Sequence, residues 1–174
     1  KPHDLKRRAR RTQPKSQNFY LRSIQAAFDY AATNLKDADF AKRVAHRLCL
    51  SANNRPVMSL SAVTRHLTKG KIAVVASTIT NDERMLVCQK MTVVALHFTA
   101  TAKARIEKAG GRCMTFDELL MENPKGENCQ MLQGVRTARK EFKFFGAAGL
   151  PHSHTDVKTV GPMAGRKGAR GPSS

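Results

Sequence analysis

Positive charge is distributed very unevenly along this 174-residue chain, and that distribution separates the segments that can form a core from those that cannot. Lys and Arg number 31 against 13 Asp and Glu, a formal net charge of +18. Residues 1–22 and 134–174 hold +13 of this excess, whereas residues 23–133 carry only +5. One-signed or Gly- and Pro-rich segments cannot bury enough apolar surface to offset their ordering entropy. The sequence therefore predicts a folded centre with basic arms and a polyanionic partner.

Hydrophobic periodicity divides the centre into a helical start and a region of strands and helices. Apolar residues recur at helical spacing over 20–35 and 40–49, and a shorter third helix is expected over 59–70. From Lys71 the pattern changes to short β-branched runs. The elements expected there are strands at 71–78, 85–88 and 92–98, a helix ending at 109, a strand at 112–115 and a helix that opens with Thr115 and Glu118 at capping-box spacing. The expected N-caps of the other helices are Ser16, Asp37 or Asp39, Ser59 or Ser61, and Thr99 or Thr101.

This order of elements implies the α/β fold class, with N-terminal helices followed by helices packed on a small, mostly buried sheet. A helix that crosses over between two strands favours parallel neighbours there. We expect three segments: a basic arm over 1–15, a helical start plus α/β core over 16–150, and a Gly/Pro-rich basic C-terminal arm over 151–174.

No motif for catalysis or cofactor binding has the spacing that its chemistry requires. Gly70 and Lys71 resemble the end of a phosphate-binding P-loop, but Ile72 stands where Ser or Thr should bind Mg²⁺, and Arg65 where the first Gly should be. The four cysteines match no zinc spacing, and we expect free thiols in a reducing intracellular compartment, with Cys49, Cys88 and Cys113 as small buried hydrophobes and not nucleophiles. The longest apolar run, 72–76, is too short to span a membrane. We therefore predict no enzyme, no cofactor, no small-molecule substrate and no membrane contact.

Basic residues interleave with aromatic ones in the segment 134–146, and two histidines follow it. Guanidinium groups match phosphate bidentately, and aromatic rings either anchor a segment to a core or stack on bases. We favour core anchoring for Phe142, Phe144 and Phe145. The two histidines allow either a metal site or polar contacts from a loop, and we favour loop contacts. The residues concerned are Arg136, Arg139, Lys140 and Lys143, with His152 and His154.

Six separated motifs recur in order along the chain: PKSQNFYLR at 14–22, NRPVMSLS at 54–61, VVASTITND at 74–82, KAGGRCMTFDEL at 108–119, NPKG at 123–126 and PHSHT at 151–155. Together they make the chain resemble large-subunit ribosomal protein eighteen of eukaryotes, a family with an archaeal form and a more distant bacterial relative, large-subunit protein fifteen. The resemblance implies a structural protein of the cytosolic ribosome, assembled in the nucleolus. It also implies a core of irregular β-β-α turns, extensions among ribosomal RNA helices, and neighbouring large-subunit proteins as partners.

Carried onto this chain, the resemblance and the charge pattern identify candidate RNA-binding residues in the arms and loops. Arms without aromatic platforms grip backbone phosphate and suit folded RNA better than a sequence-read duplex. The candidates outside 134–154 are Lys6, Arg7, Arg8, Arg10, Arg11 and Lys15, then Asn54 and Arg55, Lys125, and finally Arg166, Lys167 and Arg170. The alternatives are an RNA-modifying enzyme or assembly factor that grips RNA with basic arms, and a general basic coat of nucleic acid.

Overall fold

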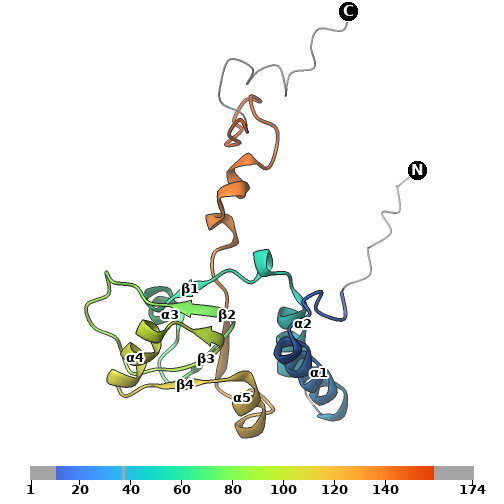
Figure 1. The fold of residues 1–174 in the computed structure, drawn as a ribbon, viewed down its shortest axis with the longest axis vertical. Helices are drawn as coiled ribbons and strands as arrows, with labels where there is room; N and C mark the ends of the chain where they lie inside the picture. Colours follow the sequence, from blue (N-terminus) through green and yellow to red (C-terminus); the bar gives the residue numbers. More distant parts are fainter. Residues whose placement is uncertain (1–10, 37, 159–174) are drawn as a thin grey trace, which may run out of the picture. The chain divides into compact units, whose positions relative to one another are not determined.

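The computed structural model describes residues 11–36 and 38–158, and the chain divides into two compact units between Gly134 and Val135 (Figure 1). The first unit contains α1 (Phe19–Asn34), α2 (Asp39–Cys49), the 3₁₀ turn η1 (Ala52–Asn54), β1 (Met58–Ser59), α3 (Leu60–His66), β2 (Ile72–Thr80), β3 (Thr92–Phe98), α4 (Ala100–Lys108), β4 (Arg112–Met114), α5 (Phe116–Glu122) and β5 (Cys129–Leu132). The second unit contains the 3₁₀ turns η2 (Arg136–Ala138) and η3 (Lys140–Phe144).

All pairings in the sheet are parallel, and β2 lies at its centre. The order is β1-β2-β3-β4, and β5 also pairs with β2. β5 pairs with the first half of β2, from Ile72 to Val75, whereas β1 pairs with its end, at Ile79 and Thr80. β1 and β5 therefore follow one another along the same edge of β2. The α/β class and the parallel neighbours are as the sequence predicts.

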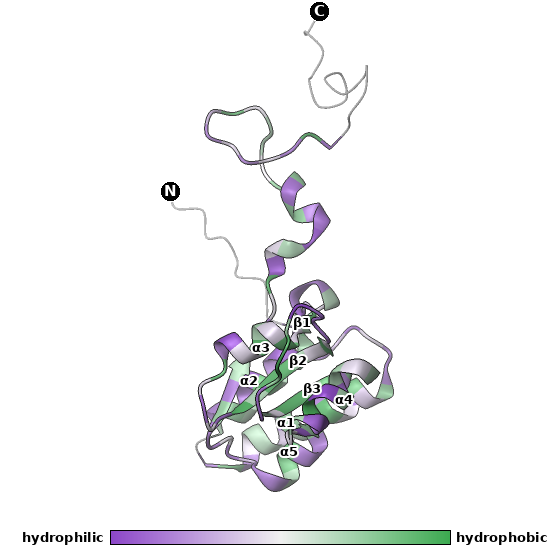
Figure 2. Cartoon of the chain, turned by 90° about the vertical axis from the view of Figure 1, so that its left-hand side faces the viewer, coloured by the Kyte–Doolittle hydropathy of each residue, from purple (hydrophilic) through white to green (hydrophobic). Residues whose placement is uncertain are grey.

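Two hydrophobic clusters cover the two faces of the sheet. One cluster joins α1, α2 and α5 to alternate strand residues such as Val74 and Val94. The other joins α3 and α4 to the intervening residues Val75 and Val93. Because both faces are covered, β2 is buried continuously from residue 73 to residue 77, and Figure 2 colours β2 and β3 as hydrophobic strands between more polar helices.

Two of the predicted helix starts are wrong by one or two residues. α1 begins at Phe19, and its N-cap is Asn18, whose side chain accepts a hydrogen bond from the backbone N–H of Leu21 at 3.4 Å. Ser16 instead accepts from the N–H of Asn18, in a turn that precedes the helix. α2 begins at Asp39 behind Ala38, so this carboxylate lies in the first turn and not at the cap.

The other predicted helix starts are confirmed. Ser59 caps α3 by accepting from the N–H of Ala62, and Thr99 occupies the N-cap position of α4 without a side-chain hydrogen bond. At α5 the N–H of Thr115 donates to Glu118 Oε2 at 2.9 Å, the reciprocal bond of a capping box. Local pairs of this kind need no tertiary information, which is why the sequence shows them.

The predicted strand at 85–88 is wrong: this segment is a loop in which Leu86 and Val87 are 92% and 78% exposed. Arg105 of α4 holds the loop, donating from NH1 to Asn81 Oδ1 at 2.9 Å and to the carbonyl oxygen of Asp82 at 2.7 Å. Apolar composition alone indicates a strand here, but within the described residues this segment pairs with no strand of the sheet. Two strands, β1 and β5, were not predicted; they are only two and four residues long.

Candidate nucleic-acid interface

Eleven of the eighteen predicted contact residues lie in the described part of the chain. The others, which lie outside it, are Lys6, Arg7, Arg8, Arg10, Arg166, Lys167 and Arg170. Five of the described residues belong to the first unit and six to the second. No helix in residues 11–36 or 38–158 is both long and apolar enough to cross a bilayer.

The root of the N-terminal arm is attached to the helices. The carbonyl oxygen of Thr12 accepts a hydrogen bond from Gln25 Nε2 at 3.1 Å and one from Cys49 Sγ at 3.2 Å, which joins the arm to both α1 and α2. Pro14 is buried, whereas the two predicted cations Arg11 and Lys15 are exposed. The helices therefore fix where the arm leaves the core while its charges stay available to a partner.

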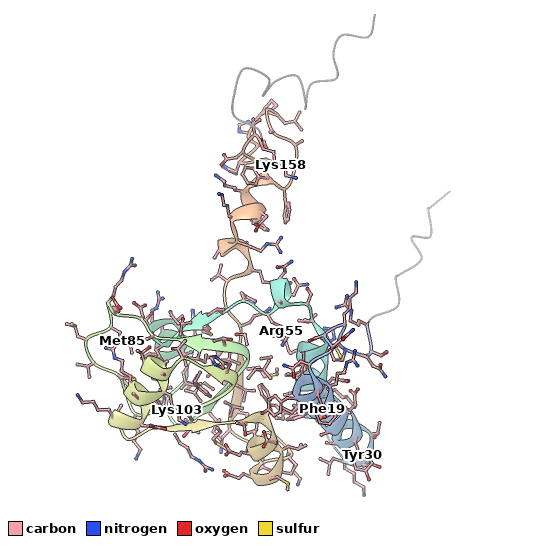
Figure 3. The ribbon with its side chains drawn as sticks, viewed as in Figure 1. Phe19, Tyr30, Arg55, Met85, Lys103 and Lys158 are labelled. Atoms are coloured by element: carbon pink, nitrogen blue, oxygen red, sulfur yellow. The ribbon has the colours of Figure 1, made fainter. Side chains whose placement is uncertain are left out.

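The NRP loop, residues 54–56, is connected by hydrogen bonds to the end of α2 and to the residue that follows β5. Figure 3 shows Arg55 in the connection from α2 to β1. Arg55 Nε donates to the carbonyl oxygen of Leu50 at 2.9 Å, and burial lowers the pKa of its guanidinium. Gln133 Nε2 donates to the carbonyl oxygen of Asn54 at 2.6 Å, and Gln133 Oε1 accepts from Arg47 at 2.8 Å. Arg55 thus has a structural role within the chain, which leaves only part of its guanidinium for an external ligand.

The NPKG loop packs directly on α2. Asn123 Oδ1 accepts from the N–H groups of Gly126 and Glu127 at 3.0 and 3.1 Å, which closes the loop. Gly126 has φ +74°, and a Cβ built on it would lie 2.1 Å from Cγ of Phe40. Only glycine allows this approach, and it holds Lys125 exposed beside the helix.

A groove of about 610 Å³ lies between α2 and the segment 125–131. Its cationic lining residues are Arg43, Arg47 and Lys125, and the imidazole of His46 also lines it. The acidic residue among its described lining residues is Asp39, which has Lys42 Nζ at 3.6 Å, so part of its charge is already compensated. The groove therefore favours an anion, and guanidinium and ammonium groups at its walls match phosphate oxygens.

Lys125 is among the contacts predicted from the sequence, whereas its groove neighbours on α2, which are Arg43, His46 and Arg47, are not. A usable signal was present, because positions 43, 46 and 47 have the i, i+3, i+4 spacing that places residues on one helix face. The apolar positions of α2 predict its buried face, and the basic positions on its other face carry no prediction of what they contact. That the basic face lies against the NPKG loop depends on contacts between residues about 80 positions apart, and local spacing carries no information about these.

In the second unit, two of the predicted cations already have acidic partners. Arg139 Nε lies 3.4 Å from Glu141 Oε2, and Lys143 Nζ lies 3.1 Å from Asp156 Oδ2. Surface pairs of this kind contribute about 0–1 kcal/mol, so they do not prevent exchange for a phosphate. The remaining predicted cations of this segment, Arg136 and Lys140, are exposed.

Two of the three phenylalanines of this segment, Phe142 and Phe145, are not buried in a core, whereas Phe144 is half-buried. Phe142 and Phe145 are 44% and 56% exposed, and their ring centroids lie 5.7 Å apart in an edge-to-face contact. The Arg139 guanidinium lies 5.5 Å from the centroid of Phe145, and Lys143 Nζ lies 5.0 Å from that of Phe144. The favoured interpretation of Phe142 and Phe145 as core anchors is therefore wrong: both rings are largely exposed and contact each other, and Phe145 carries the Arg139 guanidinium on its face.

The two histidines of the PHSHT motif are exposed on a loop that other residues of the motif hold in place. Ser153 Oγ donates to the carbonyl oxygen of Ala147 at 2.7 Å, and Thr155 Oγ1 donates to that of Phe145 at 2.9 Å. His152 has φ +60°, an uncommon value for a residue with a side chain. In residues 11–36 and 38–158 no three metal-ligating side chains come together.

The four cysteines make no disulfide, and burial raises the pKa of each thiol. Cys49 is buried, as predicted, whereas Cys88 and Cys113 are only half-buried. A raised pKa keeps a thiol protonated at neutral pH, which is the opposite of what a nucleophile needs.

The fold and these surfaces define a small basic α/β protein whose cations are spread over arms, loops and one helix face. The model of the family described as ribosomal protein 60S L18 and 50S L18e matches residues 1–173, and the chain belongs to this family. It is therefore a ribosomal protein, a structural constituent of the ribosome and not an enzyme. The resemblance stated from the six motifs is confirmed, and the modifying-enzyme alternative is set aside.

Curated relatives agree with this assignment over most of their length. Large ribosomal subunit protein eL18 of Bombyx mori is 43% identical over 175 residues, which cover 97% of this chain and 95% of that protein. The eL18 of Plutella xylostella is 46% identical over 158 residues, 88% of this chain and 86% of that protein. The eL18 of Drosophila melanogaster is 45% identical over 160 residues, 88% and 84% of the two chains.

Proposed function

We propose that this chain binds and stabilises folded ribosomal RNA in the large ribosomal subunit, through its basic arms and through the groove between α2 and the NPKG loop. The observation that carries the proposal is that groove, where three cationic side chains from two distant segments, Arg43, Arg47 and Lys125, line one depression. Membership in a ribosomal protein family supports RNA as the polyanion. Neighbouring large-subunit proteins complete the surroundings, and assembly is expected to begin in the nucleolus.

The arms and the groove make different contributions to RNA binding. The one-signed run at 5–16 holds six Lys or Arg and no acid, so it replaces counterions along the RNA backbone. This electrostatic contribution to the binding free energy carries no information about the sequence or shape of the RNA. The groove is built on rigid elements, and it therefore selects a phosphate path of fixed geometry. Arms supply most of the affinity, and the groove with its flanking loops supplies the register.

The test is cosedimentation of the tagged full chain with large subunits, before and after a high-salt wash. The groove variant is Arg43→Gln with Lys125→Gln, and the control is Lys103→Gln with Lys108→Gln. The control removes the same charge from two exposed lysines of α4, which do not line the groove. We expect the wild type and the control to remain bound near one-to-one after the wash, and the groove variant to dissociate at lower salt.

Binding to purified large-subunit ribosomal RNA gives the same comparison as a slope. Each phosphate contact that is lost should reduce the dependence of log K on log salt by about 0.7–0.9. If log K depends equally on log salt in the groove variant and in the control, the proposal that the groove binds RNA is contradicted. Absence of the wild-type chain from the large-subunit peak would contradict the proposed function as a whole.

A further inference from the structure

A second basic depression, of about 400 Å³, lies at the amino-terminal edge of the sheet, on the first unit. It is lined by residues 64, 67–72 and 89–92, which include Lys69, Lys71 and Lys90. None of the six motifs that carry the family resemblance includes these lysines. Nor do they belong to the predicted RNA contacts. Lys71, which begins the expected strand at 71–78, also belongs to the incomplete P-loop pattern described above.

Two segments form this depression because β2 and β3 begin side by side. Ala73 pairs with Val93, so the residues just before each strand meet at the same edge. A tight turn leads into β2: the N–H of Lys71 donates to the carbonyl oxygen of Thr68 at 3.2 Å, and Gly70 has φ +80°. Register and turn therefore bring Lys69 and Lys71 to one wall of the depression and Lys90 to the other.

The depression is electrostatically one-sided. No Asp or Glu lines it, and in residues 11–36 and 38–158 none of its three lysines takes part in an ion pair. Two of the last four carbonyl oxygens of α3, which would repel an anion, are engaged: Leu67 N–H donates to that of Val63 and Gln130 Nε2 donates to that of His66. Three exposed ammonium groups therefore act together on whatever occupies this space.

Uncommitted polar groups accompany these charges. Within the described part of the chain, the side chains of Thr68, Gln89 and Thr92 make no hydrogen bond, although all three line the depression. A hydroxyl or an amide N–H can donate to a phosphate oxygen that an ammonium group also contacts. None of the described residues that line the space is aromatic, so among them a nucleotide base would find no stacking partner.

We propose that this depression, formed by the turn 68–71 and the start of β3, is a second phosphate site for the RNA backbone, held by Lys69, Lys71 and Lys90. The inference rests on the proposed function, because RNA supplies the phosphate. A phosphate group on a free nucleotide has the same chemistry, and the missing stacking partner favours the RNA backbone. Gly70 and Lys71 then bind phosphate without the Mg²⁺ ligand and the first glycine of a P-loop.

The test uses the ¹⁵N-labelled full chain, observed by NMR at the backbone amides of 68–72 and 89–92. The probes are a short oligouridine, ATP and inorganic pyrophosphate, each titrated separately. The test variant is Lys71→Gln with Lys90→Gln, and the charge-matched control is Lys42→Gln with Lys103→Gln. Lys71→Arg with Lys90→Arg keeps the charge and checks for recovery, and thermal unfolding by circular dichroism checks that every variant folds.

We expect oligouridine to shift these amides in the wild type and in the control. The Gln variant should bind at this site about ten-fold more weakly, and the Arg variant should restore most of the affinity. Unshifted amides, or equal affinities in the Gln and control variants, would overturn the inference. So would tighter saturation by ATP than by oligouridine, which would assign the site to free nucleotides. If only this inference fails, the wild type still cosediments with large subunits, whereas loss of that association contradicts the proposed function.

Discussion

Replacing Gly126 by alanine should destabilise the first unit much more than the same replacement at Gly70. Both glycines have positive φ, +74° and +80°, so each substitution forces an L-residue into the left-handed region. They differ in their surroundings: a Cβ at Gly126 would lie 2.1 Å from Phe40 Cγ, whereas at Gly70 the described structure has no heavy atom within 4 Å. The pair therefore separates backbone strain from steric overlap.

The magnitude follows from these two terms. The left-handed conformation costs a residue with a Cβ about 1–2 kcal/mol. Carbon atoms pack at about 3.5–4.0 Å, so the overlap at Gly126 requires the loop or the Phe40 ring to move by more than about 1 Å, and overpacking of this kind costs about 1–3 kcal/mol. We expect Gly70→Ala to cost only the first term and Gly126→Ala about 2–5 kcal/mol in total.

Urea unfolding followed by far-ultraviolet circular dichroism measures both values, and the absence of Trp makes this the natural probe. Phe40→Ala provides the second half of a double-mutant cycle, because removing the ring removes the overlap. In that background Gly126→Ala should cost no more than Gly70→Ala. Equal costs for the two glycines in the wild-type background, within about 0.5 kcal/mol, would refute the packing of the NPKG loop on α2.

Three further results are expected. Asn18→Ala should lower the free energy of unfolding, measured in urea, by about 0.5–2 kcal/mol, because it removes the N-cap of α1. An unchanged free energy of unfolding would show that Asn18 is not the residue that caps this helix. Burial, and then the hydrogen bond to Asp117, raises the pKa of Tyr20 to about 12, so ultraviolet titration should show one late tyrosinate, and Asp117→Asn should move it earlier. Since this folded-state pKa exceeds the unfolded value, the contribution of Tyr20 to stability is complete below pH 10.0 and is lost as the pH rises towards 12. In thiol labelling Cys49 should react more slowly than the half-buried Cys88, and faster labelling of Cys49 would contradict its burial.

Much of the fold could be predicted, because its elements carry local signals. The helical spacing of α1 and α2 and the β-branched runs of β2 and β3 needed no partner to be recognised. Helix caps were right where two residues a few positions apart bond to each other, as Thr115 and Glu118 do. The predicted cap failed before α1, where two candidates lie close together: Ser16 and Asn18 are equally good caps, and the entry of the chain decides between them.

The site was predictable only in part. Charge segregation identifies the arms, and the six motifs identify the family. The basic groove and the second depression could not be predicted, since each joins segments that are distant in the chain. The phenylalanines show the same limit: an aromatic residue predicts burial in general, but whether apolar partners surround Phe142 depends on the tertiary structure.

The sequence by itself determined the fold class, the unequal division of charge and the family, because composition, periodicity and short motifs are properties of neighbouring residues. The tertiary structure alone decided that 85–88 is a loop, that β1 and β5 share one edge of β2, and which lysines and arginines meet across a groove. The physical reason is that strand pairing and side-chain convergence take their energy from contacts between distant segments. Such contacts form only when the whole sheet is assembled with its register.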